Sequence, residues 1–312
     1  MLLALWACSN ELDFLGLDKL NKSEKPLQII TRVLTTKSAG FVPEFPQGAT
    51  IGLHVTSGSV GDLYTDTADY KNVKAVAYPG DRRITWQQAP TIHLNSQKAT
   101  IYAYSPYQEG IDFNPRQIPV RIAADASETA DYMYGSQAIG QKAVSNASPV
   151  VLLSMNHALS LVSFQLKRDP GQKGAFIVTS AQVGNRAGGS LLACEGNMDI
   201  STGTISVSAI NNTCASTRLS LRQPITLTNA YSDPLRLKVI PPAKAFGPRD
   251  VDVLFTINGG SYIFRIPSNT RWEKGVKYLY KLNFNGKSLH LESRSIEDWF
   301  PGDGACNNAK KL

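Results

Sequence analysis

The sequence predicts an all-β fold, and three observations lead to this prediction. Apolar and polar residues alternate in short runs, and turn-forming groups such as SGSVGD and YPGDRR separate these runs. The runs recur at intervals of roughly ten residues, which is typical of β-sandwiches. No segment of about a dozen residues combines the 3.6-residue apolar repeat with the capping residues of a helix. We therefore expect strands and turns along the whole folded part of the chain.

The first half of the chain carries five segments with this strand pattern. They are residues 28–34 (QIITRVL), 51–55, 73–77, 100–104 and 157–166 (HALSLVSFQL). The last of them fits a strand better than a helix, because its apolar residues alternate instead of recurring every third or fourth position.

Two β-hairpins are expected in the second half. They are residues 253–266, turning at Asn258-Gly259, and residues 278–291, turning at Asn285-Gly286. Asn-Gly suits a two-residue hairpin turn because both central residues must take a positive φ.

The composition excludes several classes of protein. Of the 312 residues, 42% are hydrophobic, 9% aromatic and 18% charged, unlike a disordered chain, a coiled coil or a collagen-like rod. No apolar run approaches the roughly 20 residues of a membrane-spanning helix. The net charge of +7 comes from scattered lysines and arginines, whereas nucleic-acid binding calls for clustered basic residues. We expect no nucleic-acid partner.

A domain boundary is expected near residues 167–173 (KRDPGQK), a polar stretch that contains proline and glycine. It divides the chain into residues 27–168 and residues 169–312, each of a normal size for a β-sandwich. We find no strict internal repeat.

The N-terminus resembles a lipoprotein signal. Residues 1–7 (MLLALWA) are apolar and lead into Cys8, and Leu5-Trp6-Ala7-Cys8 looks like a lipobox whose cysteine accepts a lipid. On this interpretation residues 1–8 form a truncated signal and residues 9–26 a polar tether. The alternative is a start codon followed by a chance apolar run.

The sequence carries no recognised catalytic or metal-binding motif. The histidines His54, His93, His157 and His290 are far apart, and there is no nucleophile elbow or phosphate-binding loop. The acidic segment DLYTDTAD lacks the glycine and terminal glutamate of a calcium loop. We therefore expect no enzyme activity, no cofactor and no metal.

Two cysteines favour a disulfide. Cys194 and Cys214 lie in a turn-rich segment that can return the chain to its starting point. In an exported protein this pair would close a loop worth about 3 kcal/mol of unfolded-state entropy. Cys306 has no evident partner.

Four segments carry a resemblance to a known family. In chain order they are DYMYGS (131–136), SMNHALSLVSFQL (154–166), WEKGVKYLYKLNF (272–284) and SIEDW (295–299). With the lipobox cysteine, they resemble the fimbrillin-like lipoproteins of Bacteroidales, the subunits and accessory proteins of type V pili. Within these segments we expect Trp272 to open a strand, Lys274-Gly275 to form its turn, and His157 to lie at a strand start.

The resemblance implies a fold, a location and partners. It implies two tandem transthyretin-like Greek-key β-sandwich domains in a fimbrial or adhesion protein of the outer membrane and cell surface. The lipid anchor, bearing palmitate, would be attached at Cys8. The partners would be other fimbrial subunits, and host or bacterial receptors or glycans.

The resemblance also implies assembly by strand donation. An arginine-specific protease removes the first strand in polymerising members, and a neighbour's strand fills the vacated groove. Arg32 lies inside QIITRVL, the only early β-prone run, and is the candidate cleavage site. Equally, Arg32 can be a solvent-facing residue of an ordinary first strand. Residues 300–312 (FPGDGACNNAKKL) have little apolar alternation, which favours a tip, anchor or accessory role over a shaft subunit.

A second hypothesis is an outer-membrane lipoprotein module that binds glycans. Tyr102, Tyr104, Tyr107 and Trp86 could form an aromatic platform for sugars, although core positions fit their strand alternation better. A glycosidase ranks third, because its paired carboxylates would come from distant strands and nothing marks them.

Overall fold

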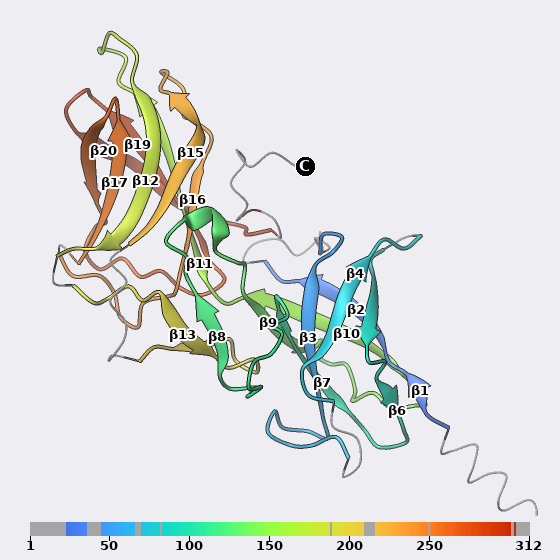
Figure 1. The fold of residues 1–312 in the computed structure, drawn as a ribbon. Coiled ribbons are helices and arrows are strands. Elements are labelled where there is room, and N and C mark those ends of the chain that lie inside the picture. Colours follow the sequence, from blue (N-terminus) through green and yellow to red (C-terminus); the bar gives the residue numbers. More distant parts are fainter. Residues whose placement is uncertain are drawn as a thin grey trace, which may run out of the picture.

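The computed structural model confirms the all-β prediction. It describes residues 23–35, 45–65, 70–81, 83–187, 189–208, 216–248, 250–300 and 303. These residues form twenty strands and one short 3₁₀ helix, η1 (Ala126–Glu128), arranged in two lobes (Figure 1). No helix in these ranges is long and apolar enough to cross a membrane.

The first lobe is built on one seven-stranded sheet. The strands of this lobe, seven in the sheet and two in a separate pair, are β1 (Lys25–Pro26), β2 (Gln28–Val33), β3 (Thr50–Thr56), β4 (Val73–Tyr78), β5 (Thr85–Ala89), β6 (His93–Leu94), β7 (Thr100–Ser105), β9 (Met133–Gln137) and β10 (Val150–His157). The sheet order is β2-β10-β9-β7-β3-β4-β5, while β1 and β6 form a separate pair. All neighbours are antiparallel except β2 and β10, which are parallel.

The seven-stranded sheet curls until its two edges meet through side chains. The indole Nε1 of Trp86 on β5 donates to Thr31 Oγ1 on β2 at 3.2 Å, and Gln88 Nε2 on β5 donates to the Leu27 carbonyl at 2.6 Å. The face inside the curl holds the apolar core of the lobe, which includes Ile51 and Leu153. The first lobe is thus a nearly closed layer in which β2 fills the last gap.

The second lobe is a sandwich of two four-stranded sheets. Its strands are β11 (Ser160–Arg168), β12 (Ile177–Asn185), β15 (Ser216–Thr226), β16 (Leu235–Val239), β17 (Val251–Ile257), β18 (Gly260–Arg265), β19 (Lys277–Phe284) and β20 (Leu289–Glu297). The orders are β16-β11-β19-β20 and β15-β12-β17-β18. Phe164 joins the sheets, because its ring lies edge-on to Phe255 and stacks on Tyr280, both at 5.5 Å.

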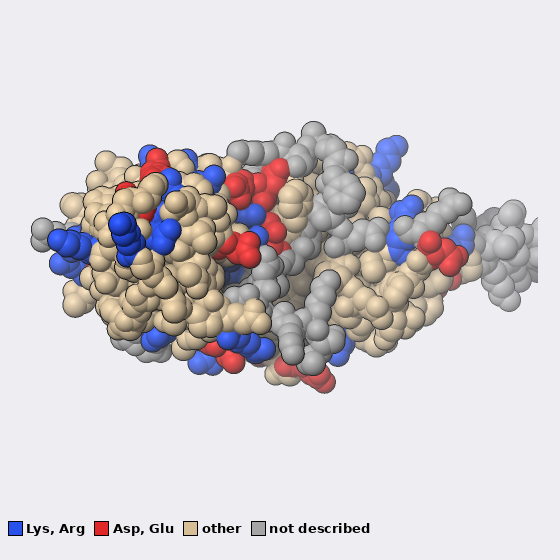
Figure 2. Space-filling view, turned by 90° about the horizontal axis from the view of Figure 1, so that it is seen from above, with Lys and Arg blue, Asp and Glu red and all other residues tan. Residues whose placement is uncertain are grey.

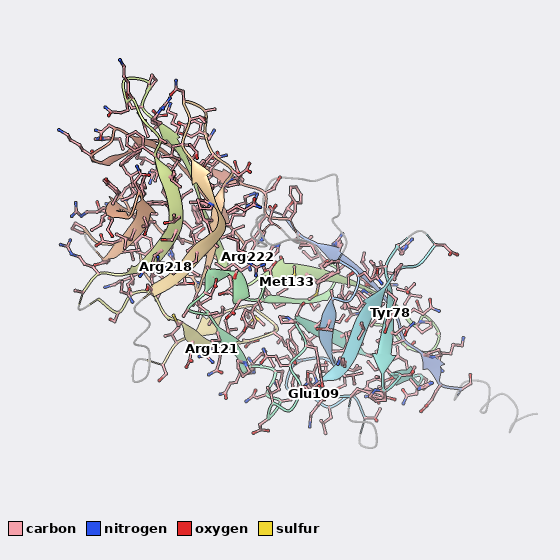
Figure 3. The ribbon with its side chains drawn as sticks, turned by 45° about the horizontal axis from the view of Figure 1, so that its top comes forward. Tyr78, Glu109, Arg121, Met133, Arg218 and Arg222 are labelled. Atoms are coloured by element: carbon pink, nitrogen blue, oxygen red, sulfur yellow. The ribbon has the colours of Figure 1, made fainter. Side chains whose placement is uncertain are left out.

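A third sheet joins the lobes. Strand β8 (Ile118–Arg121) comes from the first half, whereas β13 (Glu195–Met198) and β14 (Ile205–Ser206) come from the second, and their order is β14-β13-β8. The chain after β8 continues against β15, since Arg218 N donates to the Ala124 carbonyl at 2.8 Å. Figure 3 shows Arg121 and Arg218 on these neighbouring elements. A separate apolar cluster, including Tyr104, Met198 and Trp299, fills the junction.

The two expected hairpins form, with one difference in turn geometry. Strands β17 and β18 turn at Asn258 and Gly259, whose φ values of 48° and 77° are both positive, as a two-residue turn requires. Strands β19 and β20 pair from Phe284 to Leu289 and leave a four-residue loop. In that loop the Asn285 side chain accepts from the Ser288 amide at 2.8 Å, and φ is positive at Gly286.

The segment 157–166 contains two strands instead of one. Strand β10 ends at His157 and β11 begins at Ser160, so the expectation of His157 at a strand start is wrong. Strand β11 is hydrogen bonded between β16 and β19 of the second lobe. This pairing favours a division near residues 158–159, before the expected boundary at 168; the extent of independently folding domains stays a prediction, as does the Greek-key description.

Trp272 also differs from expectation. It does not open a strand but lies in the loop before β19, fully buried, with its indole Nε1 donating to the Tyr280 hydroxyl at 2.9 Å. The turn at Lys274 and Gly275 is confirmed, and Gly275 has a φ of 73°. The apolar ring is drawn into the sandwich because its one polar atom finds a buried partner there.

Candidate strand-exchange site at the edge strand β2

Strand β2 forms one edge of the seven-stranded sheet and pairs only with β10. Its register aligns Ile29 with Val151 and Arg32 with Ser154. Backbone hydrogen bonds close both ends of the strand, from Gln28 N to the Pro149 carbonyl and from Leu34 N to the Met155 carbonyl, each 2.8 Å long. The backbone of an edge strand is hydrogen bonded into the sheet along one side only, so its removal disrupts one ladder of the sheet.

The inward side chains of this segment are part of the first lobe's core. Leu27, Ile29 and Val33 are 3%, 7% and 3% exposed, and all three belong to one apolar cluster. The alternation follows from the pleat, which sends every second side chain inward. Each such side chain contributes roughly 1.5–3 kcal/mol of burial free energy. Removing the segment would leave an apolar groove along β10.

Polar contacts from strand β5 hold the other side of β2. Besides the Trp86–Thr31 and Gln88–Leu27 bonds, Leu27 N, directly before β2, donates at 2.9 Å to the carbonyl of Ile92, which follows β5. Trp86 and Gln88 therefore belong to the groove. The sequence did not place them beside β2, since more than fifty residues separate them from it. Without β2, the groove would expose these donors and acceptors beside the free edge of β10.

Arg32 lies within β2 and is half-buried. Its guanidinium Nε donates to Ser154 Oγ at 2.8 Å, directly across the ladder to β10. The peptide bond after Arg32 is therefore part of a paired strand, and a protease needs local opening of β2 to reach it. Cleavage at Arg32 stays a prediction.

Two of the predicted site cysteines, Cys8 and Cys214, lie outside the described residues, as does Cys306. Cys194 is described and is disulfide-bonded. Its pairing with Cys214 stays a prediction. The signal of residues 1–8 and most of the tether also fall outside the described ranges.

The histidines take structural positions. His54 is 2% exposed and its Nε2 lies 2.9 Å from the Val60 carbonyl, while His290 on β20 contacts Ser288 in the preceding loop. Within the described ranges, no group of three or more histidine, cysteine, aspartate or glutamate side chains could hold a metal ion.

The aromatic platform proposed for glycans does not form. Trp86 and Tyr104 are 8% and 0% exposed, and both lie in apolar clusters. The Tyr102 hydroxyl donates to the Gly58 carbonyl, and burial raises the pKa of this phenol. Trp86 and Tyr104 are thus core residues, as the favoured interpretation of their alternation has it. Tyr102 is half-buried against the junction cluster, and Tyr107 is half-buried with Lys74 Nζ 5.3 Å from its ring centroid.

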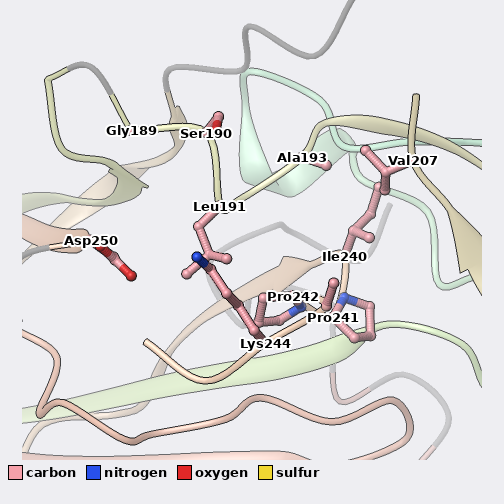
Figure 4. A pocket seen from close by; sticks show the side chains of 11 residues that line it. Gly189, Ser190, Leu191, Ala193, Val207, Ile240, Pro241, Pro242, Lys244 and Asp250 are labelled. Atoms are coloured by element: carbon pink, nitrogen blue, oxygen red, sulfur yellow. The ribbon is translucent and has the colours of Figure 1, made fainter. Parts of the chain in front are cut away.

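A pocket of about 570 Å³ lies in the second lobe, close to the junction (Figure 4). Leu191, Ile240 and Pro242 give it apolar walls, and Lys244 and Asp250 bring one positive and one negative charge to it. None of these residues contacts β2, so the pocket has no part in the strand-exchange site.

Basic side chains are dispersed over the surface. Figure 2 shows Lys and Arg in small separate groups over the second lobe, and Asp and Glu interspersed with them. The +7 charge thus produces no single basic patch on the face shown.

Solved structures of similar fold come from Bacteroides. A candidate cell adhesion protein from Bacteroides ovatus aligns with a TM-score of 0.63 over 90% of this chain and 100% of its own, at 16% identity. One from Bacteroides uniformis aligns with a TM-score of 0.60 over 88% and 98%, at 16% identity. A fimbrial protein from Bacteroides vulgatus aligns with a TM-score of 0.55 over 87% and 99%, at 15% identity.

The TM-scores of these alignments show a common fold. No curated protein sequence matches the chain. A family model described as fimbrillin-like matches residues 31–299, well over half of the sequence, from within β2 to the buried Trp299. The chain therefore belongs to the fimbrillin-like family.

Proposed function

We propose that this chain is a non-enzymatic fimbrial or adhesion component of the cell surface that exchanges β2 for a strand of a neighbouring subunit. The observation that carries the proposal is the construction of β2. It is an edge strand whose inward side chains complete the core. Its backbone pairs with β10 only, and side-chain hydrogen bonds connect it to β5. A donated strand with the same alternation would restore both the ladder on β10 and the apolar contacts.

In this proposal, cleavage at Arg32 releases the N-terminal part of β2 and leaves its groove along β10 empty. Cleavage after Arg32 would free Leu27 and Ile29 from the core and leave Val33 as the new N-terminus. The vacated backbone edge of β10 and the Trp86 and Gln88 side chains would then accept the incoming strand.

The anchor and the place in the fibre belong to the same proposal. Cys8 carries the lipid and holds the chain at the outer membrane. A tip, anchor or accessory role in the fibre is part of this proposal. Labelling cells with radioactive palmitate tests the anchor: Cys8→Ala should lose both the label and the membrane fraction, whereas retained label places the lipid elsewhere.

Strand exchange is tested by controlled cleavage of the full chain carrying Cys8→Ser, which keeps it free of lipid. We expect an arginine-specific protease to produce a new N-terminus at Val33. The cut protein should then bind a synthetic peptide of residues 27–34 or form SDS-resistant ladders. Lys in place of Arg32 is the matched control, since it keeps the positive charge but removes the cleavage site.

Three outcomes would contradict the proposal. The first is ladder formation by the Arg32→Lys chain under the same protease. The second is cleavage after Arg32 followed by a folded monomer that binds no peptide. The third is cutting elsewhere while residues 27–34 stay in place.

The disulfide is a separate structural proposal. We propose that Cys194 pairs with Cys214 and closes the segment between β13 and β15. Peptide mass spectrometry without reduction should yield a linked peptide containing both cysteines. A linkage between Cys194 and Cys306 would overturn this assignment.

A further inference from the structure

A second pocket, of about 420 Å³, opens at the edge of the second lobe. Residues 266–276 connect β18, in one sheet of the sandwich, to β19 in the other, and so cross the open side of the lobe. Strand β20 is the edge of its sheet at that side. The pocket lies between this loop and the edge strand.

The strand register places four of the lining residues on one face. Tyr280 on β19 aligns with Arg294 on β20, and Tyr278 aligns with Ile296. Directly opposed residues project to the same face of an antiparallel pair. Tyr280 belongs to the core of the sandwich, so Arg294 and Ile296 lie on the inner face at its open edge. An inner-face arginine at the edge of a sandwich is unusual, because such positions are normally apolar.

The deeper part of the pocket presents hydroxyl groups. The Tyr280 hydroxyl accepts a hydrogen bond from Trp272 Nε1 at 2.9 Å and keeps its own hydrogen for another acceptor. Burial raises the pKa of Tyr280 to about 12, so this phenol is a neutral donor at physiological pH. Thr270 is 6% exposed, and its Oγ1 accepts from Arg294 Nη1 at 3.5 Å.

Two guanidinium groups stand at the rim of the pocket. Arg271 and Arg294 are both exposed, and among the described residues no carboxylate forms an ion pair with either. No aspartate or glutamate lines the pocket. Glu273 lies two positions after Arg271, and its backbone N donates to the Tyr278 hydroxyl at 2.9 Å. Burial raises the pKa of Tyr278, and the Glu273 charge raises it further, by more than the Arg271 charge lowers it. The pocket therefore combines positive charge with hydrogen-bond donors.

We propose that this pocket binds a sugar that carries an oxyanion, either a carboxylate or a sulfate. The planar fork of an arginine matches two oxygens of such a group. The half-buried Tyr278 ring and the Ile296 side chain, which is 44% exposed, cover the C–H face of the sugar. The volume lies in the range of small-molecule sites.

The proposal is independent of strand exchange, because the pocket shares no residue with β2. An isotope-labelled full chain carrying Cys8→Ser would be titrated with glucuronic acid, glucose 6-sulfate, glucose and sodium sulfate, each up to about 10 mM, and followed by NMR. We expect one of the two charged sugars to bind at least about tenfold more tightly than glucose and than free sulfate, since a charge-assisted hydrogen bond is worth about one such factor. Which charged sugar binds more tightly identifies the oxyanion.

Matched variants locate the site. Arg294→Gln and Arg271→Gln should each weaken the binding by about fivefold or more, and Ile296→Ala should weaken it without changing the preference for charge. Arg222→Gln is the control, because Arg222 is an exposed arginine on β15 of the opposite sheet (Figure 3). All four positions are exposed, so the variants are expected to fold like the parent chain.

Three results would overturn the proposal. Equal affinity for glucose and the charged sugars removes the role of the arginines. Equal loss of binding in Arg222→Gln shows non-specific attraction to the +7 chain. No binding of either charged sugar at about 10 mM rules out this ligand class at the pocket.

Discussion

The indole of Trp299 lies flat on the imidazole of His157, with ring centroids 4.0 Å apart and planes inclined by 6°. His157 ends the last strand of the first lobe, and its Nδ1 lies 2.9 Å from Asp131 Oδ1. Trp299 follows the last strand of the second lobe and is fully buried. This stack therefore ties the exit of the second lobe to the frame of the first.

Removing the Trp299 ring from this stack should destabilise the whole molecule. Trp299→Ala removes a fully buried ring from the junction core, and we expect a loss of about 3–5 kcal/mol in the free energy of unfolding. Urea denaturation followed by circular dichroism measures it. Ile139→Ala, at a side chain that is 99% exposed, is the control and should cost about 0.5 kcal/mol or less. A loss below about 1 kcal/mol for Trp299→Ala would show that the junction does not need the stack.

Two buried tyrosines should make the fold sensitive to alkaline pH. Burial raises the pKa of Tyr104 and of Tyr280 to about 12, against an ordinary value of 10.0. Between these values the unfolded chain releases the phenol proton while the folded chain keeps it, so stability falls as pH rises through this window and levels off above it. Each tyrosine contributes on the order of 2–3 kcal/mol to this fall.

The pH effect is measured as a difference in slope. The double variant Tyr104→Phe and Tyr280→Phe should show a shallower loss of unfolding free energy between about pH 10 and about pH 12 than the parent chain. Its absolute stability will differ because hydrogen bonds to Asn72 and Trp272 are lost, but the slope does not depend on that. Parallel curves would mean that these phenols ionise as freely in the folded chain as in the unfolded one.

A glycine at the junction should resist replacement. Gly203 has a φ of 67°, and a Cβ there would lie 1.9 Å from the Tyr134 ring. Gly203→Ala should therefore cost about 3 kcal/mol or more, from backbone strain and the clash together. Gly140→Ala separates the two causes, because Gly140 also has a positive φ but nothing within 4 Å of the added Cβ. Gly140→Ala should cost only about 1–2 kcal/mol, and equal costs at the two sites would contradict the role of Tyr134.

The hydrogen bond from Trp86 should control the opening of β2. Thr31→Val keeps the side-chain shape but removes the acceptor of the Trp86 indole N–H. We expect the amides of Gln28 and Leu34, which bond to the neighbouring backbone, to exchange with deuterium about threefold to tenfold faster. Thr226→Val, at the end of β15, should leave these amides unchanged. Unaltered exchange in Thr31→Val would mean that β10 alone holds the strand.

Local patterns predicted the strands well, since alternation reports burial within a single segment. The hairpin at Asn258-Gly259 follows from two residues that tolerate positive φ. The segment 157–166 was predicted as one strand because Ala158 and Leu159 are apolar and continue the pattern. Both are fully buried in the junction cluster, so they turn the chain without a polar or glycine signal.

Long-range partners were beyond the reach of the sequence. The position of Arg32 in an early β-prone run was visible, but its pairing with Ser154 joins residues more than a hundred positions apart. The same holds for His157 against Trp299, and Trp86 lies 55 positions from Thr31. These contacts are set by the topology of the sheets, and a single sequence carries no direct record of it.

The shared sheet β14-β13-β8 limits how such a protein can diversify. Strand β8 is encoded in the first half, and its partner β13 lies in the second. A chimera that joined this chain to a relative at residue 158 would pair β8 of one protein with β13 of the other. We therefore expect the two halves to be exchangeable only where the new sequences preserve this pairing.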